Sequence, residues 1–358
     1  MTIRDTLGRV FQPGLIADIP TGNLLWVDAV NGKDDLAVRG RMTVPFKTLT
    51  KAKTAATSGD TIMVLPGTYD ENNLAKNGVN WHFLTGAVVE YSGTGAGVLS
   101  AALFDTAQTG GAATFKVTGN GVFKTTNSSN YVHAFSFTNS ADVVTLQFDR
   151  IESRGAAINS DGTLTATGNE AKSTANQAID LGGSSESVLN IDRILSAAGS
   201  AVIVAGTSAS CIVRIRAVVI DSTAGYTFHF SRGTAYVDAY EITSSGGMNT
   251  VVYDCSYNEH LHLRVSRIVN TLNSTSARAL EILSGSAAPN GAIHLYGCVL
   301  FSKYGTYAVS AGSAKDVLCP QWCVVKAKTT GGGSGSSNVT ARIHTFLDVT
   351  SNTNVGDL

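Results

Sequence analysis

Side chains capable of acid–base chemistry are spread thinly along this chain, and three of them form the strongest catalytic candidates. Asp180, His229 and Glu281 each directly follow an apolar residue in a short strand-like segment. A carboxylate and an imidazole can share proton transfer only within hydrogen-bond reach of the same reacting atoms. In the repeat described below, Asp180 and His229 share one face, but Ile203 lies between them. About two strand spacings, or about 10 Å, would then separate the pair, so solvated charge is the preferred interpretation.

Two further groups contain residue types that bind metal ions. Four residues of one polar loop could hold calcium through oxygen ligands: Asp28, Asn31, Asp34 and Asp35. A turn held by side-chain-to-backbone hydrogen bonds explains the same four residues and is preferred. His260 and His262 alternate with leucines and point to one face of a strand, but two histidines alone make a poor metal site. The sequence therefore predicts no bound metal and no cofactor.

Aromatic residues offer another kind of site. Five of them could stack on sugar rings: Trp81, Trp322, Tyr226, Tyr236 and Tyr240. Aromatic stacks are also ordinary core filling in a coiled β fold, and that interpretation stays open beside the first.

These candidate residues are embedded in a repeat that begins near Asp142. Each unit has a short apolar strand, two mostly polar residues and then an aliphatic residue, at intervals of 20 to 31 residues. This first series comprises Ile151, Ala171, Ile194, Val218, Ile242, Ile268, Val299 and Val324. A second apolar series drifts along with it: Ile158, Ile179, Val202, Phe228, Val252, Leu280 and Val309. Two series with a shared period predict stacked coils, each of which buries its apolar face against its neighbours.

The residues that follow the first series predict an interface with another chain. Successive side chains of a strand point to opposite faces, so these residues should point away from the core. Five of them are apolar: Leu195, Val219, Val269, Leu300 and Val325. A stacked apolar column facing water is typical of a contact surface, and a homotrimer is the simplest arrangement. A register shifted by one residue is the alternative, because it would return these residues to the core.

The most specific pattern of the chain lies between Trp26 and Tyr69. An apolar strand over 24–27 precedes the polar loop, and a second strand over 61–65 follows a turn at Gly59 and Asp60. Pro45 opens a short helix between them, and its buried side comprises Phe46, Leu49, Ala52 and Ala56. This order resembles the N-terminal entry of the pectin-lyase-like superfamily. The resemblance implies an all-β, right-handed parallel β-helix whose open end is capped by the short helix.

Composition agrees with a coiled β architecture and argues against several classes of protein. The 358 residues include 37 glycines, while 15% are charged and 43% are hydrophobic. A net charge of −1 gives no footprint for nucleic acid, and no apolar run approaches the roughly 18 residues that suggest a membrane span. The N-terminal stretch lacks the apolar core and cleavage site of a signal peptide. Five irregularly spaced cysteines predict buried thiols.

We expect one domain with a segment at each end. Residues 23–330 form the β-helix, 1–22 form an N-terminal arm, and 331–358 form a Gly/Ser linker with a C-terminal capping strand. The arm has apolar residues without a clear period, which suits docking onto a larger particle: Val10, Phe11, Leu15, Ile16 and Ile19. A first strand that caps the β-helix is the alternative interpretation of the arm.

Two classes of function follow from the resemblance, because a fold alone does not fix an activity. Parallel β-helices of this superfamily are common in bacteriophage virions as trimeric tail spikes, fibres and capsid decorations. A non-enzymatic structural or adhesive virion protein is preferred, anchored by its arm to a capsid or tail protein and presenting loops to a host surface glycan. The alternative is a secreted lyase or hydrolase acting on an acidic polysaccharide. The polygalacturonase-like members carry an Asn-Thr-Asp strand, an Asp-Asp pair and a Gly-His-Gly, none of which occurs in these coils.

Overall fold

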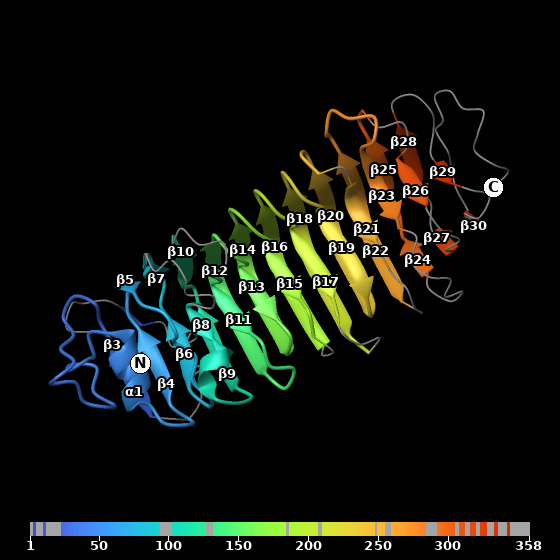
Figure 1. The fold of residues 1–358 in the computed structure, drawn as a ribbon. Coiled ribbons are helices and arrows are strands. Elements are labelled where there is room, and N and C mark those ends of the chain that lie inside the picture. The colour runs from blue at the N-terminus through green and yellow to red at the C-terminus, as the bar shows by residue number, and fades with distance from the viewer. Residues whose placement is uncertain are drawn as a thin grey trace.

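Two long parallel sheets run along the computed structural model of the chain (Figure 1). The structure describes residues 23–93, 102–126, 132–183, 186–206, 210–247, 249–254, 259–283, 292–304, 308–311, 316–319 and 323–327, with short strands at 3–4, 10–11, 333–335 and 342–343. In this part of the chain the larger sheet has 18 strands and the smaller has 10, and we call them the long sheet and the short sheet. Over residues 135–282 the chain alternates between the two sheets from one strand to the next, and the stacked parallel strands confirm the predicted parallel β-helix.

The middle of the molecule is its most regular part. Six strands of 11 residues stack in the long sheet: β12 (Val143–Ser153), β14 (Thr163–Ser173), β16 (Glu186–Ser196), β18 (Ile212–Ser222), β20 (Thr234–Ser244) and β22 (His260–Asn270). The short sheet contains β8 (Phe104–Asp105), β11 (Phe135–Phe137), β13 (Ile158–Ser160), β15 (Ile179–Leu181), β17 (Val202–Ala205), β19 (Phe228–Arg232), β21 (Asn249–Tyr253), β23 (Arg278–Ile282), β26 (Val309–Ala311) and β29 (Gly333–Gly335). One long strand and one short strand therefore make each coil.

Toward both ends of the long sheet, two shorter strands take the place of one long strand. The N-terminal strands are β3 (Leu24–Val27), β4 (Thr61–Val64), β5 (Gly67–Asp70), β6 (Asn80–Phe83), β7 (Ala87–Tyr91), β9 (Thr114–Gly119) and β10 (Val122–Thr125). The C-terminal strands are β24 (Ala292–Leu295), β25 (Val299–Ser302), β27 (Asp316–Cys319), β28 (Val324–Ala327) and β30 (Arg342–Ile343). The two halves of β22, for example, pair separately with β24 and β25.

Each long strand has two outward-facing residues in succession near its middle. In β16 these are Asp192 and Arg193, whereas buried and exposed residues alternate on either side of them. The pairing of β14 with β16 skips one position at the same place, between Gly168 and Glu170. The alternation of inward and outward residues therefore changes phase at this point and divides each long strand into two halves.

The register of the coils agrees with the predicted series at most positions and corrects it at three coils. In-register pairing puts seven buried residues in one core ladder: Ile151, Ala171, Ile194, Ile220, Ile242, Ile268 and Leu300. Val218, predicted for this ladder, is 50% exposed, and Val299 and Val324 precede the ladder positions by one residue. Runs of consecutive apolar residues, as in 217–220, leave the alternation ambiguous, and the prediction slipped there. The second series is likewise right except that Val251 replaces Val252.

The core of the N-terminal coils is a stack of aromatic rings. Seven fully or almost fully buried residues contribute to it: Trp81, Phe83, Phe104, Phe115, Phe123, Phe135 and Phe137. Phe104 and Phe135 stack with centroids 5.2 Å apart and an angle of 11° between their planes, and Phe123 meets Phe135 edge-on at 5.0 Å. In the later coils the column of Phe135 is mostly aliphatic, with Phe228 as the exception: Ile158, Ile179, Val202, Phe228 and Val251. We call the N-terminal stack the inner ladder.

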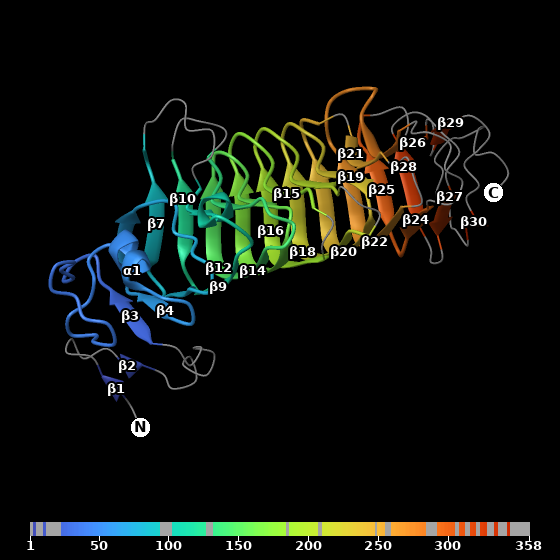
Figure 2. The same cartoon turned by 60° about the horizontal axis from the view of Figure 1, so that its bottom comes forward.

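A short helix, α1 (Leu49–Ala55), covers the N-terminal end of the coils, as predicted (Figure 2). Its buried side is the predicted set of Phe46, Leu49, Ala52 and Ala56, although the helix begins at Leu49, with Thr48 as its N-cap, rather than at Pro45. The carboxylate of Glu71 accepts hydrogen bonds from the amides of Leu49 and Thr50, each at 2.6 Å. Acceptors at these positions satisfy the amides that a helix start leaves unpaired.

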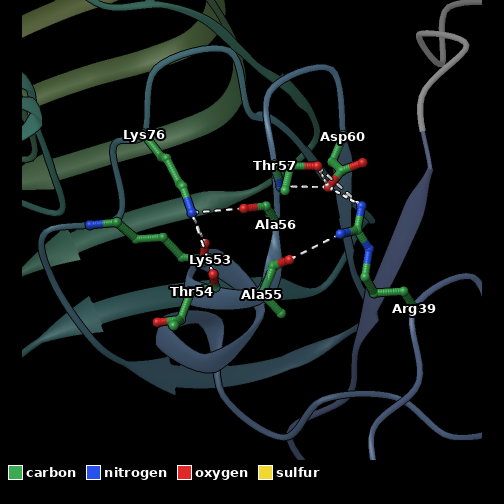
Figure 3. A network of polar contacts seen from close by, with 8 residues as sticks. All are labelled: Arg39, Lys53, Thr54, Ala55, Ala56, Thr57, Asp60 and Lys76. Carbon is green, nitrogen blue, oxygen red and sulfur yellow. Dashed lines mark hydrogen bonds and ion pairs between the residues drawn. The ribbon is translucent and has the colours of Figure 1, made fainter.

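The C-terminal end of α1 is held by two cations (Figure 3). Lys76 Nζ donates to the carbonyl oxygens of Lys53 and Ala56, at 2.8 and 2.7 Å. Arg39 donates to the carbonyl oxygen of Ala55 at 3.3 Å and forms an ion pair of 2.6 Å with Asp60. Positive charge near the last carbonyls stabilises a helix, so both ends of α1 are fixed to the first coils by side chains.

The two termini are described only in short pieces. In the predicted arm, β1 (Ile3–Arg4) pairs antiparallel with β2 (Val10–Phe11), whereas Leu15, Ile16 and Ile19 lie outside the described residues. Near the other end, β29 pairs with β26 and β30 with β27, so the sheets continue into the segment predicted as a linker and capping strand. No helix in the described part of the chain has the length and apolar character needed to cross a membrane.

Candidate functional site

An open groove of about 740 Å³ lies on the outer face of the long sheet. It runs across β16, β18, β20 and β22 and ends at Tyr296, directly after β24. Its walls come from the first halves of these strands, before the two successive outward-facing residues. Because the strands are parallel and in register, side chains of neighbouring coils line the groove as two columns that follow the axis of the solenoid.

Three arginines make the lining basic. Arg214 forms an ion pair with Glu186, and Arg264 forms one of 2.6 Å with Asp238. Arg216 is exposed and forms no ion pair with any residue that the structure describes. The lining contains one carboxylate, that of Asp238, and it is already paired with Arg264. The described lining therefore presents excess positive charge.

Aromatic and imidazole rings form the second feature of the groove. The rings of Tyr236 and His262 lie 4.6 Å apart at 12°, and those of His262 and His294 lie 4.2 Å apart at 8°. The guanidinium group of Arg214 lies 5.6 Å from the Tyr236 centroid, at the other end of the row. The row follows from the register of the strands, which pairs four residues in succession: Arg214, Tyr236, His262 and His294. We call this row the outer ladder.

Burial and mutual repulsion keep the imidazoles of the outer ladder uncharged. Partial burial, with smaller contributions from the nearby His294 and His260, lowers the pKa of His262 to about 4. Burial also lowers the pKa of His294, with a smaller contribution from His260. Both rings are therefore neutral at neutral pH and present lone pairs as well as N–H groups.

The predicted catalytic residues lie on the outer face of the short sheet, away from the groove lining. Asp180, Ile203 and His229 occupy neighbouring positions of one column, as the repeat predicted, so the acid and the imidazole do not meet. His229 lies instead 3.9 Å from Asp254. Val252, rather than Tyr253, separates His229 from Glu281 in the same column. Burial raises the pKa of Asp180 to about 6, with a contribution from Asp161.

The polar loop after β3 has the geometry of a hydrogen-bonded turn. Asp28 Oδ1 accepts from the amides of Val30 and Asn31, at 2.9 and 3.0 Å. Asp34 Oδ1 accepts from the amides of Lys47 and Thr48, so its carboxylate joins the loop to the start of α1. Asp35 is exposed. The turn interpretation, preferred from the sequence over a calcium site, accounts for the contacts of Asp28 and Asp34.

The column predicted as an oligomer interface is interrupted by polar residues. Leu195 and Val269 do face outward and are half-buried, but Asp221 and Thr243 occupy the two positions between them. Val219 belongs to a different column, between Arg193 and Glu241. Leu300 is fully buried in the core ladder, and Val325 pairs with it there. The continuous apolar column was predicted because the register was wrong by one or two residues in some coils. The homotrimer itself stays a prediction.

Sequence reasoning missed the groove and the third histidine of its edge. His294 pairs directly with His262, because β24 is in register with the first half of β22. Both histidines lie between apolar residues, in Leu261-His262-Leu263 and Ile293-His294-Leu295. Alignment of these two short strands would have placed the imidazoles side by side. The unusually long interval of 31 residues between Ile268 and Val299 hid the match.

Comparison with known proteins gives one partial match. Residues 30–77 match the family model described as a protein of unknown function (DUF1565). No curated protein and no solved structure matches the chain. The matched segment contains α1 and the four side chains that hold its ends, Asp34, Arg39, Glu71 and Lys76. The similarity therefore covers the N-terminal cap and leaves out the groove.

Proposed function

We propose that this chain is a non-enzymatic adhesive β-helix that binds an acidic polysaccharide along the groove of the long sheet. The observation that carries the proposal is the basic and aromatic lining of that groove. Arg216 supports it most directly, because its guanidinium is exposed and has no ion-pair partner among the described residues. A guanidinium binds a carboxylate or a sulfate through two parallel hydrogen bonds, so an anionic ligand fits this lining.

The shape of the groove favours a polymer over a small molecule. It is open to solvent and extends over the strands from β16 to the end of β24, a span of about 19 Å at the usual strand spacing. Sites for small molecules are more enclosed and bury most of the ligand surface. The rings of Tyr236 and Tyr296 offer apolar faces and edges of the kind on which sugars pack.

The carboxylates of the lining favour binding without hydrolysis. Most glycoside hydrolases use two carboxyl groups about 5 to 10 Å apart, one on each side of the bond that is cleaved. The described lining has one, and Asp238 is held by Arg264 at 2.6 Å. Asp180 and Glu281, the other acids considered above, belong to the short sheet. We therefore prefer adhesion to the alternative of a polysaccharide-cleaving enzyme.

A bacteriophage virion is the setting that we propose for this activity. A solenoid of stacked coils with a capped end is a rigid element suited to a tail fibre, tail spike or capsid decoration. In this proposal the N-terminal arm, which includes Val10 and Phe11, anchors the chain to a capsid or tail protein, and the solenoid presents the groove to a host surface glycan. A homotrimer would give three such grooves and therefore avidity.

Binding of the full-length chain to polymers of known charge tests the proposal. The probes are polygalacturonate, alginate and a sulfated polysaccharide, with dextran as the neutral control. We expect saturable binding of at least one anionic probe that weakens with ionic strength, and no binding of dextran. Arg216→Ala should weaken binding about 10-fold, because a charge-assisted hydrogen bond is lost. Arg150→Ala, an exposed arginine of β12 outside the groove, should leave the affinity unchanged.

Three results would overturn the proposal. The first is an absence of binding to every anionic probe, and the second is an equal loss of affinity in Arg150→Ala and Arg216→Ala. The third is cleavage of a bound probe, measured as new reducing ends or as absorbance of an unsaturated uronate, since this would establish an enzyme.

A further inference from the structure

Three histidines converge at the C-terminal edge of the groove. His260 and His262 come from β22, and His294 comes from β24 in the next coil. Each offers one ring nitrogen, and these three nitrogen atoms lie within 4.8 Å of one another. All three side chains are half-buried, so they are accessible from solvent and partly held by their surroundings. Among the described residues, this is the one group of three potential ligands that lies so close together.

The parallel register fixes this arrangement. His262 and His294 are paired residues of neighbouring strands, so their Cβ atoms point the same way. His260 lies two residues before His262 and therefore on the same face. Its ring centroid lies 5.8 Å from that of His294 and 6.3 Å from that of His262. The backbone thus brings the three imidazoles together without any long loop.

To bind one ion, the nitrogen atoms must contract slightly and the stacked rings of His262 and His294 must turn toward a common point. Zinc takes imidazole nitrogens at about 2.0–2.1 Å in tetrahedral geometry, which puts the ligand nitrogens about 3.4 Å apart. Rotation of the imidazoles about their side-chain bonds can supply the contraction from 4.8 Å. No movement of the paired backbone is required, because terminal torsions of histidine are broad.

A neighbouring hydroxyl orients the central ligand. The hydroxyl oxygen of Tyr296 lies 3.4 Å from Nδ1 of His262. Metal-binding histidines usually use their second ring nitrogen for such a contact, which fixes the tautomer and the ring orientation. With Nδ1 engaged by Tyr296, Nε2 of His262 is left as the nitrogen that would bind a metal.

The donor set determines which ions fit. Imidazole nitrogens suit Zn²⁺, Ni²⁺ and Cu²⁺, whereas Ca²⁺ and Mg²⁺ need oxygen ligands. Three protein ligands also leave one tetrahedral position open to solvent, as in zinc sites that bind water or a ligand group. We propose that His260, His262 and His294 bind one Zn²⁺ ion, or a similar divalent transition metal, at the edge of the groove. This site goes beyond the proposed adhesion and does not depend on it.

Titration of the metal-free full-length chain with Zn²⁺ tests the site, with isothermal calorimetry or a chromophoric competitor as the readout. We expect one equivalent of Zn²⁺ to bind and Ca²⁺ not to bind. His294→Phe keeps a flat ring in the outer ladder but removes the ligand atom. Its affinity for Zn²⁺ should fall by more than about 100-fold, since even partners outside the first coordination shell contribute about 10- to 100-fold. Tyr296→Phe should weaken binding by about 10-fold.

The matched control is His82→Phe, on β6 of the same sheet and outside the histidine cluster. This change should leave Zn²⁺ affinity as it is in the native chain. Should His294→Phe fail to fold, as judged by circular dichroism, His260→Gln provides a second removal of one ligand. The site does not exist if the native chain binds no Zn²⁺, or if His294→Phe or His260→Gln folds and binds it as tightly as the native chain.

Discussion

The inner and outer ladders are built in the same way, but the inner ladder lies in the core between the two sheets and the outer ladder lies on the outer face of the long sheet. In the inner ladder, Phe104 and Phe135 stack at 5.2 Å with their planes 11° apart. In the outer ladder, His262 and His294 stack at 4.2 Å with their planes 8° apart. In-register parallel strands place one ring above another in both cases. The two ladders differ in what surrounds the rings.

Burial gives the two ladders different consequences. The phenylalanines of the inner ladder are closed off from solvent, so each contributes transfer free energy and packing to the fold. Tyr236 of the outer ladder is 42% exposed, and the imidazoles beside it keep polar edges that water or a ligand can reach. Stacking in a parallel β-helix therefore stabilises the protein when it is inside and presents rings with polar edges to solvent when it is outside.

The largest effect is expected for a break in the inner ladder. Phe135 is fully buried and contacts the rings of Phe104, Phe123 and Phe137. Phe135→Ala should lower the free energy of unfolding by about 3–5 kcal/mol, because it removes the ring and leaves a cavity. Urea denaturation measures the change. Phe135→Leu, which refills most of the cavity, should lose clearly less, and equal losses in the two variants would argue against a cavity effect.

Much of the inner architecture could be predicted from the sequence. The buried side of α1, the strands on either side of it and most of the core ladder follow from apolar spacing, which burial enforces. The prediction failed where apolar residues run together, as in 217–220 and 299–301, because a strand gives no internal signal there for which residue points inward.

The outer ladder could not be predicted in the same way. Polar positions on the surface are not constrained by a core, so their spacing along the chain carries little information. Contacts such as that between His262 and His294 depend on the register of two strands that are separated by the 21 residues 271–291, which include β23 of the other sheet. The sequence alone shows that His260 and His262 lie on one face of a strand. That His294 lies beside them follows only from the pairing of β22 with β24.

A smaller effect on stability is expected on the outer face of the short sheet, where the side chain of Asp180 is a partly buried acid. The folded chain holds the pKa of Asp180 at about 6, above its ordinary value of 3.8, mainly because the carboxyl is buried. The folded state therefore favours the protonated acid. The stability from this group is complete below the unfolded pKa of 3.8 and is lost as pH rises through about 6.

The side chain introduced by Asp180→Asn cannot ionise. Above about pH 6 this variant should therefore have a higher free energy of unfolding than the native chain. We expect a gain of about 1–2 kcal/mol at about pH 8 and little difference at about pH 4, with an allowance for the partial exposure of the side chain. Thermal melts of both proteins across pH measure it. The exposed Asp192→Asn is the control. A gain that is the same at both pH values would show that the charge of Asp180 is not the cause.

The cap over the first coils should contribute less again. Glu71→Ala removes the acceptors of the Leu49 and Thr50 amides at the start of α1. Water can replace part of these bonds, so the expected loss is about 1 kcal/mol, as for other helix caps. Hydrogen exchange of those two amides should become faster, while that of the paired amides in β16 stays unchanged. A uniform increase along the solenoid would indicate instead that the cap controls the whole stack.

The smallest change in stability is expected for a break in the outer ladder. Tyr236→Ala removes a ring that contacts His262 at 4.6 Å and lies under the guanidinium of Arg214. Stacking of exposed rings and an exposed cation–π contact are each worth about 1 kcal/mol or less, and water can take the place of the lost ring. We therefore expect a loss of about 0.5 kcal/mol in urea denaturation, several times smaller than for Phe135→Ala. Binding of the anionic polysaccharide should weaken in the same variant, because the ring lines the groove. A loss of stability as large as that of Phe135→Ala would make the outer ladder part of the structural core, and the distinction between the two ladders would no longer hold.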